Sequence, residues 1–203
     1  MYIIHILYAF ISLQFEDIRL VYHVSKSECY KCLWAVIDAI NDVPELDISF
    51  PEDPAILREI ELEFAMAHNR RYGSMSWRGQ VGAIDGVDIP QRNPGKAVPN
   101  PTRYHVQRKG GHQILCIAIC DAHRRFTHYS MDHEPNSHDS LAWAGSKLGA
   151  KIKGILPSPL FLNGDNAFVQ DATMVVPMND SDYDFYHSSN RMPIECAFGI
   201  LVR

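Results

Sequence analysis

Residues 81–87 read VGAIDGV, a stretch that predicts a buried strand with a carboxylate, Asp85, at its centre. Its other residues are apolar or small, as in a strand that packs inside a protein. A buried carboxylate is costly unless a partner compensates its charge, so Asp85 is the first candidate functional residue. Because side chains alternate along a strand, we expect the nearby Asp88 on the opposite face, in solvent.

The segments that follow predict a mixed α/β sheet. Residues 112–120 (HQILCIAIC) form a nearly continuous apolar run, typical of a central strand buried on both faces. Beyond it we expect a strand over 126–131, a helix over 138–149 with Ser137 as N-cap, a short strand over 159–163 and a helix over 190–202. Antiparallel strands followed by alternating strands and helices indicate a mixed sheet flanked by helices.

The residues before the first strand predict helices. Residues 15–41 have helical spacing, with a turn near His23 and the S-x-x-E form of a capping box beginning at Ser25. A second helix over 53–69 ends before Gly73. Two helices joined by a tight turn form either a DNA-binding helix-turn-helix or a plain helical hairpin, and the spacing over 15–41 leaves both open.

The overall charge gives no signature of nucleic-acid binding. Lys and Arg number 19 against 24 Asp and Glu, a net charge of −5 in 203 residues. Phosphate contacts would therefore depend on a local cluster of cations. The basic residues that cluster in the middle of the chain are Arg92, Lys96, Arg103, Arg108, Lys109, Arg124 and Arg125.

The odd number of cysteines, five, is typical of reduced thiols in an intracellular protein. Cys116, Cys120 and His123 offer zinc-ligand types, although buried free cysteine is common in apolar strands. The apolar residues 1–13 lack the positive charge and cleavage site of a signal peptide, and they are too few to span a membrane. We therefore expect no membrane association.

Three carboxylates stand at positions that suit metal-dependent chemistry. Asp165 follows the short strand over 159–163, and Glu195 lies in the first turns of the last helix. Taken singly, Asp165 suits a turn, and Glu195 suits the positive end of a helix dipole. Brought together with Asp85, they would repel one another unless a divalent cation such as Mg²⁺ were bound. Two such ions can cleave a phosphodiester bond.

The chain resembles the PIF/Harbinger class of DDE transposases and their domesticated nuclease relatives over about residues 81–203. Four motifs carry the resemblance: VGAIDGVDIP at 81–90, PNSHDS at 135–140, FLNGDNAF at 161–168 and RMPIECAFG at 191–199. It implies a ribonuclease H-like core.

The resemblance also implies roles for individual residues. It makes Asp85, Asp165 and Glu195 the catalytic D-D-E triad that holds Mg²⁺ or Mn²⁺ and cleaves DNA. His138 and Asp139 match the family's H-D motif, which implies support of the ligands or positioning of the substrate. Arg191 lies one helical turn before Glu195, so it would orient the glutamate or contact a phosphate.

The resemblance extends to partners and domain organisation. Arg108 and Lys109 match the family's basic turn, which implies contacts with DNA. Nuclear localisation and a separate DNA-binding partner protein are implied as well. The helix-turn-helix interpretation of 15–41 gains support. We expect a helical N-terminal region over 1–72 and the endonuclease core over 73–203, while the sequence leaves the oligomeric state open.

Two departures from the family pattern bear on activity. The sequence continues for only eight residues after Glu195, which predicts a C-terminally truncated core. The interval between Asp165 and Glu195 is also short, as if a segment near 179–185 were missing. Two hypotheses therefore stand: a metal-dependent DNA endonuclease or transposase, or a catalytically inactive, transposon-derived relic that binds DNA or protein.

Overall fold

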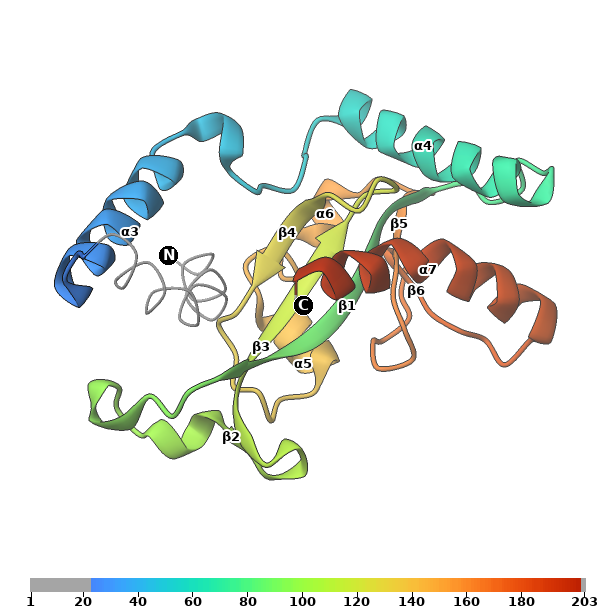
Figure 1. Ribbon diagram of the computed structural model, residues 1–203. Coiled ribbons are helices and arrows are strands. Elements are labelled where there is room, and N and C mark those ends of the chain that lie inside the picture. Colours follow the sequence, from blue (N-terminus) through green and yellow to red (C-terminus); the bar gives the residue numbers. More distant parts are fainter. Residues whose placement is uncertain (1–22, 202–203) are drawn as a thin grey trace. The chain divides into compact units, whose positions relative to one another are not determined.

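A computed structural model describes residues 23–201 and shows an α/β protein (Figure 1). A mixed six-stranded sheet is flanked by helices, consistent with a ribonuclease H-like fold, and the predicted fold class is confirmed. The chain divides into two compact units, Met1–Ile48 and Ser49–Arg203.

The first unit contains helix α3 (Lys26–Asn41) and the short 3-10 helix η1 (Pro44–Leu46). The hydroxyl of Ser25 accepts a hydrogen bond from the backbone N–H of Glu28 at 3.1 Å, so the predicted N-cap is confirmed. The apolar N-terminus and the first half of the predicted helix-turn-helix lie outside the described residues. The DNA-binding interpretation of 15–41 therefore stays a prediction.

Helix α4 (Pro54–Tyr72) opens the second unit, and both of its ends follow from local chemistry. The carboxylate of Asp53 accepts from the N–H of Ala55 at 2.8 Å, while Pro54 starts the helix with a suitable φ. Gly73 ends it in the left-handed conformation at φ 69°, which costs glycine little. Buried side chains such as Phe64 pack this helix against β1, in the same unit.

The sheet has the strand order β2-β3-β1-β5-β6, with β4 also paired to β3. The strands are β1 (Gln80–Gln91), β2 (His105–Val106), β3 (Gly111–Cys120), β4 (Phe126–Ser130), β5 (Phe161–Asn163) and β6 (Met174–Val175). The central pair β1–β3 is antiparallel, whereas β1–β5 and β5–β6 are parallel. The mixed pairing predicted from the order of elements is confirmed.

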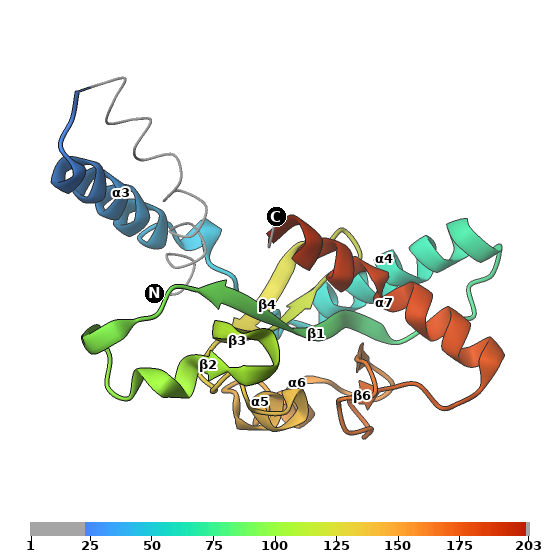
Figure 2. The ribbon, with the colours of Figure 1, turned by 60° about the horizontal axis from the view of Figure 1, so that its bottom comes forward.

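Helices cover both faces of this sheet. Figure 2 shows α7 (Ser181–Leu201) on one side, and α5 (Asp139–Gly145) with the short α6 (Ile152–Ile155) on the other. Within the described residues no helix has both the length and the apolar character needed to cross a membrane.

Two of the predicted helices have wrong boundaries. The helix expected over 138–149 has His138, not Ser137, as its N-cap, and it ends at Gly145 because the hydroxyl of Ser146 turns back to bond the carbonyl of Trp143. The helix expected from 190 begins at Ser181. The carboxylate of Asp180 accepts from the N–H groups of the second and third helical residues and so caps an earlier start.

Helix α7 contains a proline, Pro193, whose missing N–H leaves the carbonyl of Ser189 without its helical partner. The guanidinium of Arg71, at the end of α4, donates to that carbonyl at 3.0 Å and also contacts the Ser189 hydroxyl. The phenol of Tyr72 donates to the same hydroxyl at 2.6 Å. Arg71 at the end of α4 therefore replaces the hydrogen bond that Pro193 cannot donate to the Ser189 carbonyl.

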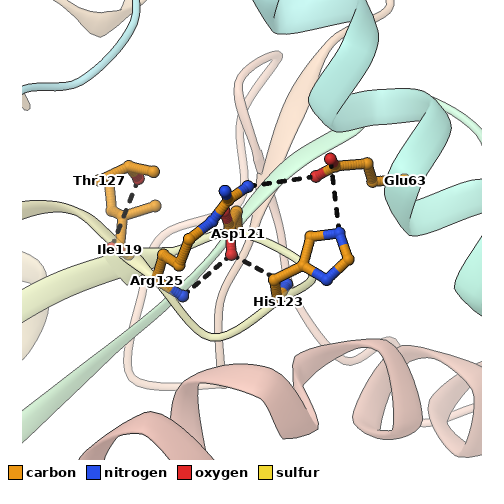
Figure 3. Close-up of polar contacts among 6 residues, drawn as sticks. All are labelled: Glu63, Ile119, Asp121, His123, Arg125 and Thr127. Atoms are coloured by element: carbon orange, nitrogen blue, oxygen red, sulfur yellow. Dashed lines mark hydrogen bonds and ion pairs between the residues drawn. The ribbon is translucent and has the colours of Figure 1, made fainter.

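A second polar cluster joins α4 to the turn between β3 and β4 (Figure 3). Asp121 accepts from the N–H of His123 and from both the N–H and the Nε of Arg125, at 2.6–2.9 Å. Glu63 of α4 lies 3.4 Å from the His123 ring and 3.9 Å from the Arg125 guanidinium. Arg124 adopts a left-handed φ of 70° at this turn, two residues before β4 begins.

Candidate active site

Asp85 and Asp165 lie at the same level of two adjacent parallel strands, Asp85 inside β1 and Asp165 two residues after the end of β5. Ala83 of β1 pairs with Asn163 of β5, and each aspartate follows two residues later, so the two aspartates stand at the same level. Strand β1 continues past this point because β3 still pairs with it, with Asp85 opposite Ala118. The N–H of Ala167 donates to the Asp165 carboxylate at 2.9 Å and orients it.

Asp85 carries an incompletely compensated negative charge. Its side chain is 18% exposed, and burial raises its pKa from 3.8 to about 6. Repulsion by Asp165 and Asp139 adds to this rise. Arg191 and the N–H of Gly86, which donates at 2.9 Å, lower the pKa without offsetting the effect of burial.

One guanidinium, that of Arg191, joins Asp85 to Glu195. Its Nη1 donates to Asp85 Oδ2 at 2.9 Å, and its Nη2 donates to Glu195 Oε1 at 2.6 Å. Arg191 and Glu195 lie on the same face of α7 because they are one helical turn apart. The Glu195 side chain is 43% exposed, so the third predicted ligand faces Arg191 and solvent.

Asp139, the first residue of α5, lies directly against the backbone of Gly86. A Cβ atom added to that glycine would lie 2.7 Å from the Asp139 carboxyl group, which explains why glycine follows Asp85 in the first motif. Burial raises the pKa of Asp139, and repulsion by Asp165 and then by Asp88 raises it further. The preceding His138 is exposed, and its side chain does not cap the helix.

Asp88 lies on the opposite face of β1 from Asp85, as expected, but the expectation that it is solvated was wrong. Its side chain is only 8% exposed, because the turn at Gln107–Lys109 folds back and places Lys109 Nζ 2.9 Å from its carboxylate. Arg108 lies farther away, at 3.7 Å. Both cations predicted to contact DNA therefore lie beside a carboxylate of their own chain.

Asp88 lines a pocket of about 230 Å³ together with Gly86, Arg108, Lys109, Ser137 and Asp139. Its Oδ1 is buried without a hydrogen-bond partner in the described part of the chain. Sequence reasoning missed this group. Strand alternation places Asp88 on the same face as the apolar Ile84, which is fully buried, but it does not show the turn that covers Asp88.

The predicted triad is only partly assembled. Asp165 lies close enough to Asp85 to raise its pKa, but Glu195 is joined to Asp85 through Arg191. Across residues 23–201, no three His, Cys, Asp or Glu side chains are grouped so that they could hold a metal ion. The same finding leaves the zinc hypothesis for Cys116 and Cys120 without a site there; the thiols of both are free and buried, and burial raises their pKa values.

The fold and the acidic site together define an α/β protein that brings carboxylates together on adjacent strands of a mixed sheet. The chain belongs to the DDE superfamily of endonucleases: residues 84–203, more than half of its length, match the model of the family described as "DDE superfamily endonuclease". The match begins at the strand that carries Asp85 and includes every residue predicted for the catalytic site.

Curated relatives agree with this family. The protein named "Putative nuclease HARBI1" is 22% identical in Rattus norvegicus over 178 residues (85% of this chain, 48% of the relative). The protein of that name in Homo sapiens is 22% identical over 184 residues (88% and 50%), and that in Xenopus laevis is 20% identical over 178 residues (85% and 48%). This chain spans about half the length of these relatives.

The resemblance to Harbinger-type DDE transposases and their nuclease relatives is confirmed by these matches. No solved structure matches this chain.

Proposed function

We propose that this chain cleaves DNA phosphodiester bonds as the metal-dependent core of a DDE endonuclease or transposase. The observation that carries the proposal is the state of Asp85: a largely buried carboxylate beside Asp165, with a pKa of about 6 despite its contact with Arg191. A bound cation would relieve the repulsion between the carboxylates of Asp85 and Asp165. The family and the nuclease relatives support the same chemistry.

Asp85 and Asp165 suit a divalent cation. Mg²⁺ is commonly held by one or two carboxylates together with water and substrate phosphate, and these two residues offer carboxylates at one level of the sheet. DDE superfamily endonucleases generally use divalent metals. Mg²⁺ or Mn²⁺ bound here would activate the nucleophile, either a water or the 3′-hydroxyl of a DNA strand, and would stabilise the leaving oxygen.

Glu195 is proposed as the third ligand, and Arg191 controls when it is available. In the structure Glu195 bonds the guanidinium, so it can bind a cation only after that ion pair opens. The opened pair leaves Arg191 free to contact a substrate phosphate. Asp139 holds the backbone of β1 at Gly86, and the exposed His138 is available to position substrate.

The proposal extends to partners and location. DNA is the substrate, a separate protein assists in recognising it, and the nucleus is where the reaction takes place. These points rest on what the resemblance to Harbinger-type transposases implies.

A second function, a catalytically inactive relic that binds DNA or protein, is favoured by one observation. Arg191 separates Glu195 from Asp85, and the described residues contain no three-ligand group. This hypothesis predicts DNA binding that does not depend on the carboxylates.

The test compares two identical substitutions on opposite faces of one strand, Asp85→Asn and Asp88→Asn. Mg²⁺ or Mn²⁺ is titrated into each variant by calorimetry, and nicking of supercoiled DNA is followed in parallel. We expect Asp85→Asn to lose metal binding and to lower nicking at least about 10³-fold, because several kcal/mol of transition-state stabilisation disappear. Asp88→Asn should retain metal binding, and its nicking should fall far less than that of Asp85→Asn.

The outcomes separate the two functions. A folded wild-type chain that binds metal without nicking DNA contradicts the cleavage proposal. One that neither binds metal nor nicks DNA favours the relic. Nicking that survives in Asp85→Asn would show that another site is responsible.

A further inference from the structure

The segment between β1 and β3 concentrates positive charge in an otherwise acidic chain. Residues 89–120 contain five Lys or Arg and no Asp or Glu. All five cations lie in residues 92–110, which we call the arm; Figure 1 shows it at the end of the sheet away from α4. A polyanion that approaches the acidic site at Asp85 is repelled there, so an adjacent cationic surface would favour its binding.

The structure divides the arm's cations into those with a partner and those without. Lys109 and Arg108 lie beside Asp88, and Arg103 pairs with Glu134 at 3.3 Å. Arg92 and Lys96 are exposed, and neither forms an ion pair with any residue in the range 23–201.

The remaining basic residues of the central cluster lie elsewhere. Arg124 and Arg125 are at the opposite end of β3, roughly 30 Å from the arm by strand geometry, and Arg125 is already bonded to Asp121. Only Arg92 and Lys96 therefore combine exposure, absence of a partner in the described residues and a position on the arm.

The base of the arm is held to the candidate site. Val106 is buried, and β2 pairs with β3. The amide of Asn136 donates to the carbonyl of His105 at 3.2 Å, and Glu134 bonds Arg103. Both of these partners lie in the loop that leads directly into Asp139. The loop that carries the H-D motif therefore also fixes the arm.

The tip of the arm is restrained by its own sequence. Prolines at 94, 99 and 101 fix φ at three positions of the segment. A restrained segment loses less conformational entropy on binding than a free loop does.

We propose that Arg92 and Lys96 contact the phosphate backbone of DNA that extends from the acidic site along β1, roughly 20 Å from Asp85 by strand geometry, while Lys109 holds the arm on β1. The inference rests on the proposed function in that DNA is the ligand. It adds the surface that binds the backbone and distinguishes the cations that touch phosphate from those that serve the fold.

The test measures binding of the full chain to a fluorescent DNA duplex of mixed sequence, by anisotropy, in EDTA and over a series of salt concentrations. The variant Arg92→Gln/Lys96→Gln is compared with Lys147→Gln/Lys151→Gln. This control removes the same charge at exposed lysines that have no ion pair within the described residues. Circular dichroism and thermal melts confirm that both variants are folded.

We expect the arm variant to reduce the slope of log K against log salt by about 2, since each phosphate contact contributes about 0.9. The control should keep the wild-type slope. Equal slopes for the two variants would overturn the inference, and so would a wild-type chain that does not bind the duplex at low salt.

Binding in EDTA requires no metal, so the inference and the proposed function can fail separately. An arm-dependent slope in a chain that never nicks DNA supports the arm and refutes the nuclease. Metal-dependent nicking with an unchanged slope in the arm variant supports the nuclease and refutes the arm.

Discussion

On one face of β1, Asp88 lies 2.9 Å from Lys109; on the other, Asp85 shares the guanidinium of Arg191 with Glu195. Both carboxylates are largely buried, with 8% and 18% of their side chains exposed. The difference lies in the charges around them. Asp88 has a lysine of its own, whereas Asp85 competes for one arginine and is repelled by two further aspartates.

The comparison shows how a structural carboxylate and a functional one can be told apart. A carboxylate that serves the fold is compensated by its own chain, as Asp88 is by Lys109. One that waits for an external cation keeps a perturbed pKa, because its own chain leaves part of its charge uncompensated. By this criterion Asp85 is the candidate functional carboxylate of the strand.

The largest expected effect is on the pH dependence of stability. Because the folded-state pKa of Asp85 is raised from 3.8 to about 6, its favourable contribution is complete below pH 4 and is lost as the pH rises through 6. At about 1.4 kcal/mol per pKa unit, the loss amounts to about 3 kcal/mol. Asp85→Asn cannot ionise, so we expect it to be about 3 kcal/mol more stable than wild type at pH 8 in EDTA and equal to it near pH 4.

Urea unfolding of both proteins across this pH range measures the difference in their free energies of unfolding. Subtracting one from the other at each pH cancels the contribution of the histidines, which the two proteins share. A gap between the two proteins that stays constant with pH would show that Asp85 is already compensated in the fold. The two faces of β1 would then be electrostatically alike.

The next effect concerns Asp88. Lys109→Met removes the cation closest to Asp88 and leaves its buried carboxylate unpaired. We expect the free energy of unfolding to fall by about 2 kcal/mol. This is less than the value for a fully buried ion pair, because the Lys109 side chain is 42% exposed. Arg108→Met is the matched control. At 3.7 Å and 79% exposed, Arg108 should contribute less than about 0.5 kcal/mol. Equal losses in urea unfolding would mean that the turn at Gln107–Lys109, rather than one ion pair, protects Asp88.

Gly86 lies next to Asp85 in β1, and its replacement tests whether Asp139 of α5 positions the strand. In Gly86→Ala the new Cβ meets the carboxyl group of Asp139, so we expect a loss of about 1–2 kcal/mol. In an Asp139→Ala background the clash is absent, and the same substitution should be nearly neutral. A double-mutant cycle in urea measures the coupling, which we expect to exceed about 1 kcal/mol. Additive effects would show that α5 yields without cost and does not position β1.

Local pattern was sufficient for the features that depend on neighbours in the chain. The apolar runs of β1 and β3, the Ser25 cap and the Gly73 stop lie where alternation and capping chemistry predict them. The level arrangement of Asp85 and Asp165 needs the register of β1 with β5, and the structure supplies it.

Features that depend on distant contacts escaped prediction. Nothing near Asp88 indicates that a turn some twenty residues later covers it, and the bond between Arg191 and Asp85 joins positions 106 residues apart. The early start of α7 was hidden by its polar first turns, which the cap at Asp180 stabilises. The short β6 has only two residues and forms because β5 offers it a partner.

The smallest expected effect concerns the turn of α7 that carries Arg191 and Glu195. Pro193 lies between Arg191 and Glu195, and Arg71 bonds the carbonyl that the proline leaves unpaired. We expect Arg71→Met to lower the free energy of unfolding by about 1 kcal/mol, and to cost clearly less in a Pro193→Ala background, where a helical N–H takes over the Ser189 carbonyl. Urea unfolding of the four proteins measures this coupling. If Arg71→Met costs the same in both backgrounds, Arg71 acts through the Ser189 hydroxyl alone, and the turn of α7 that carries Arg191 and Glu195 keeps its geometry without help from α4.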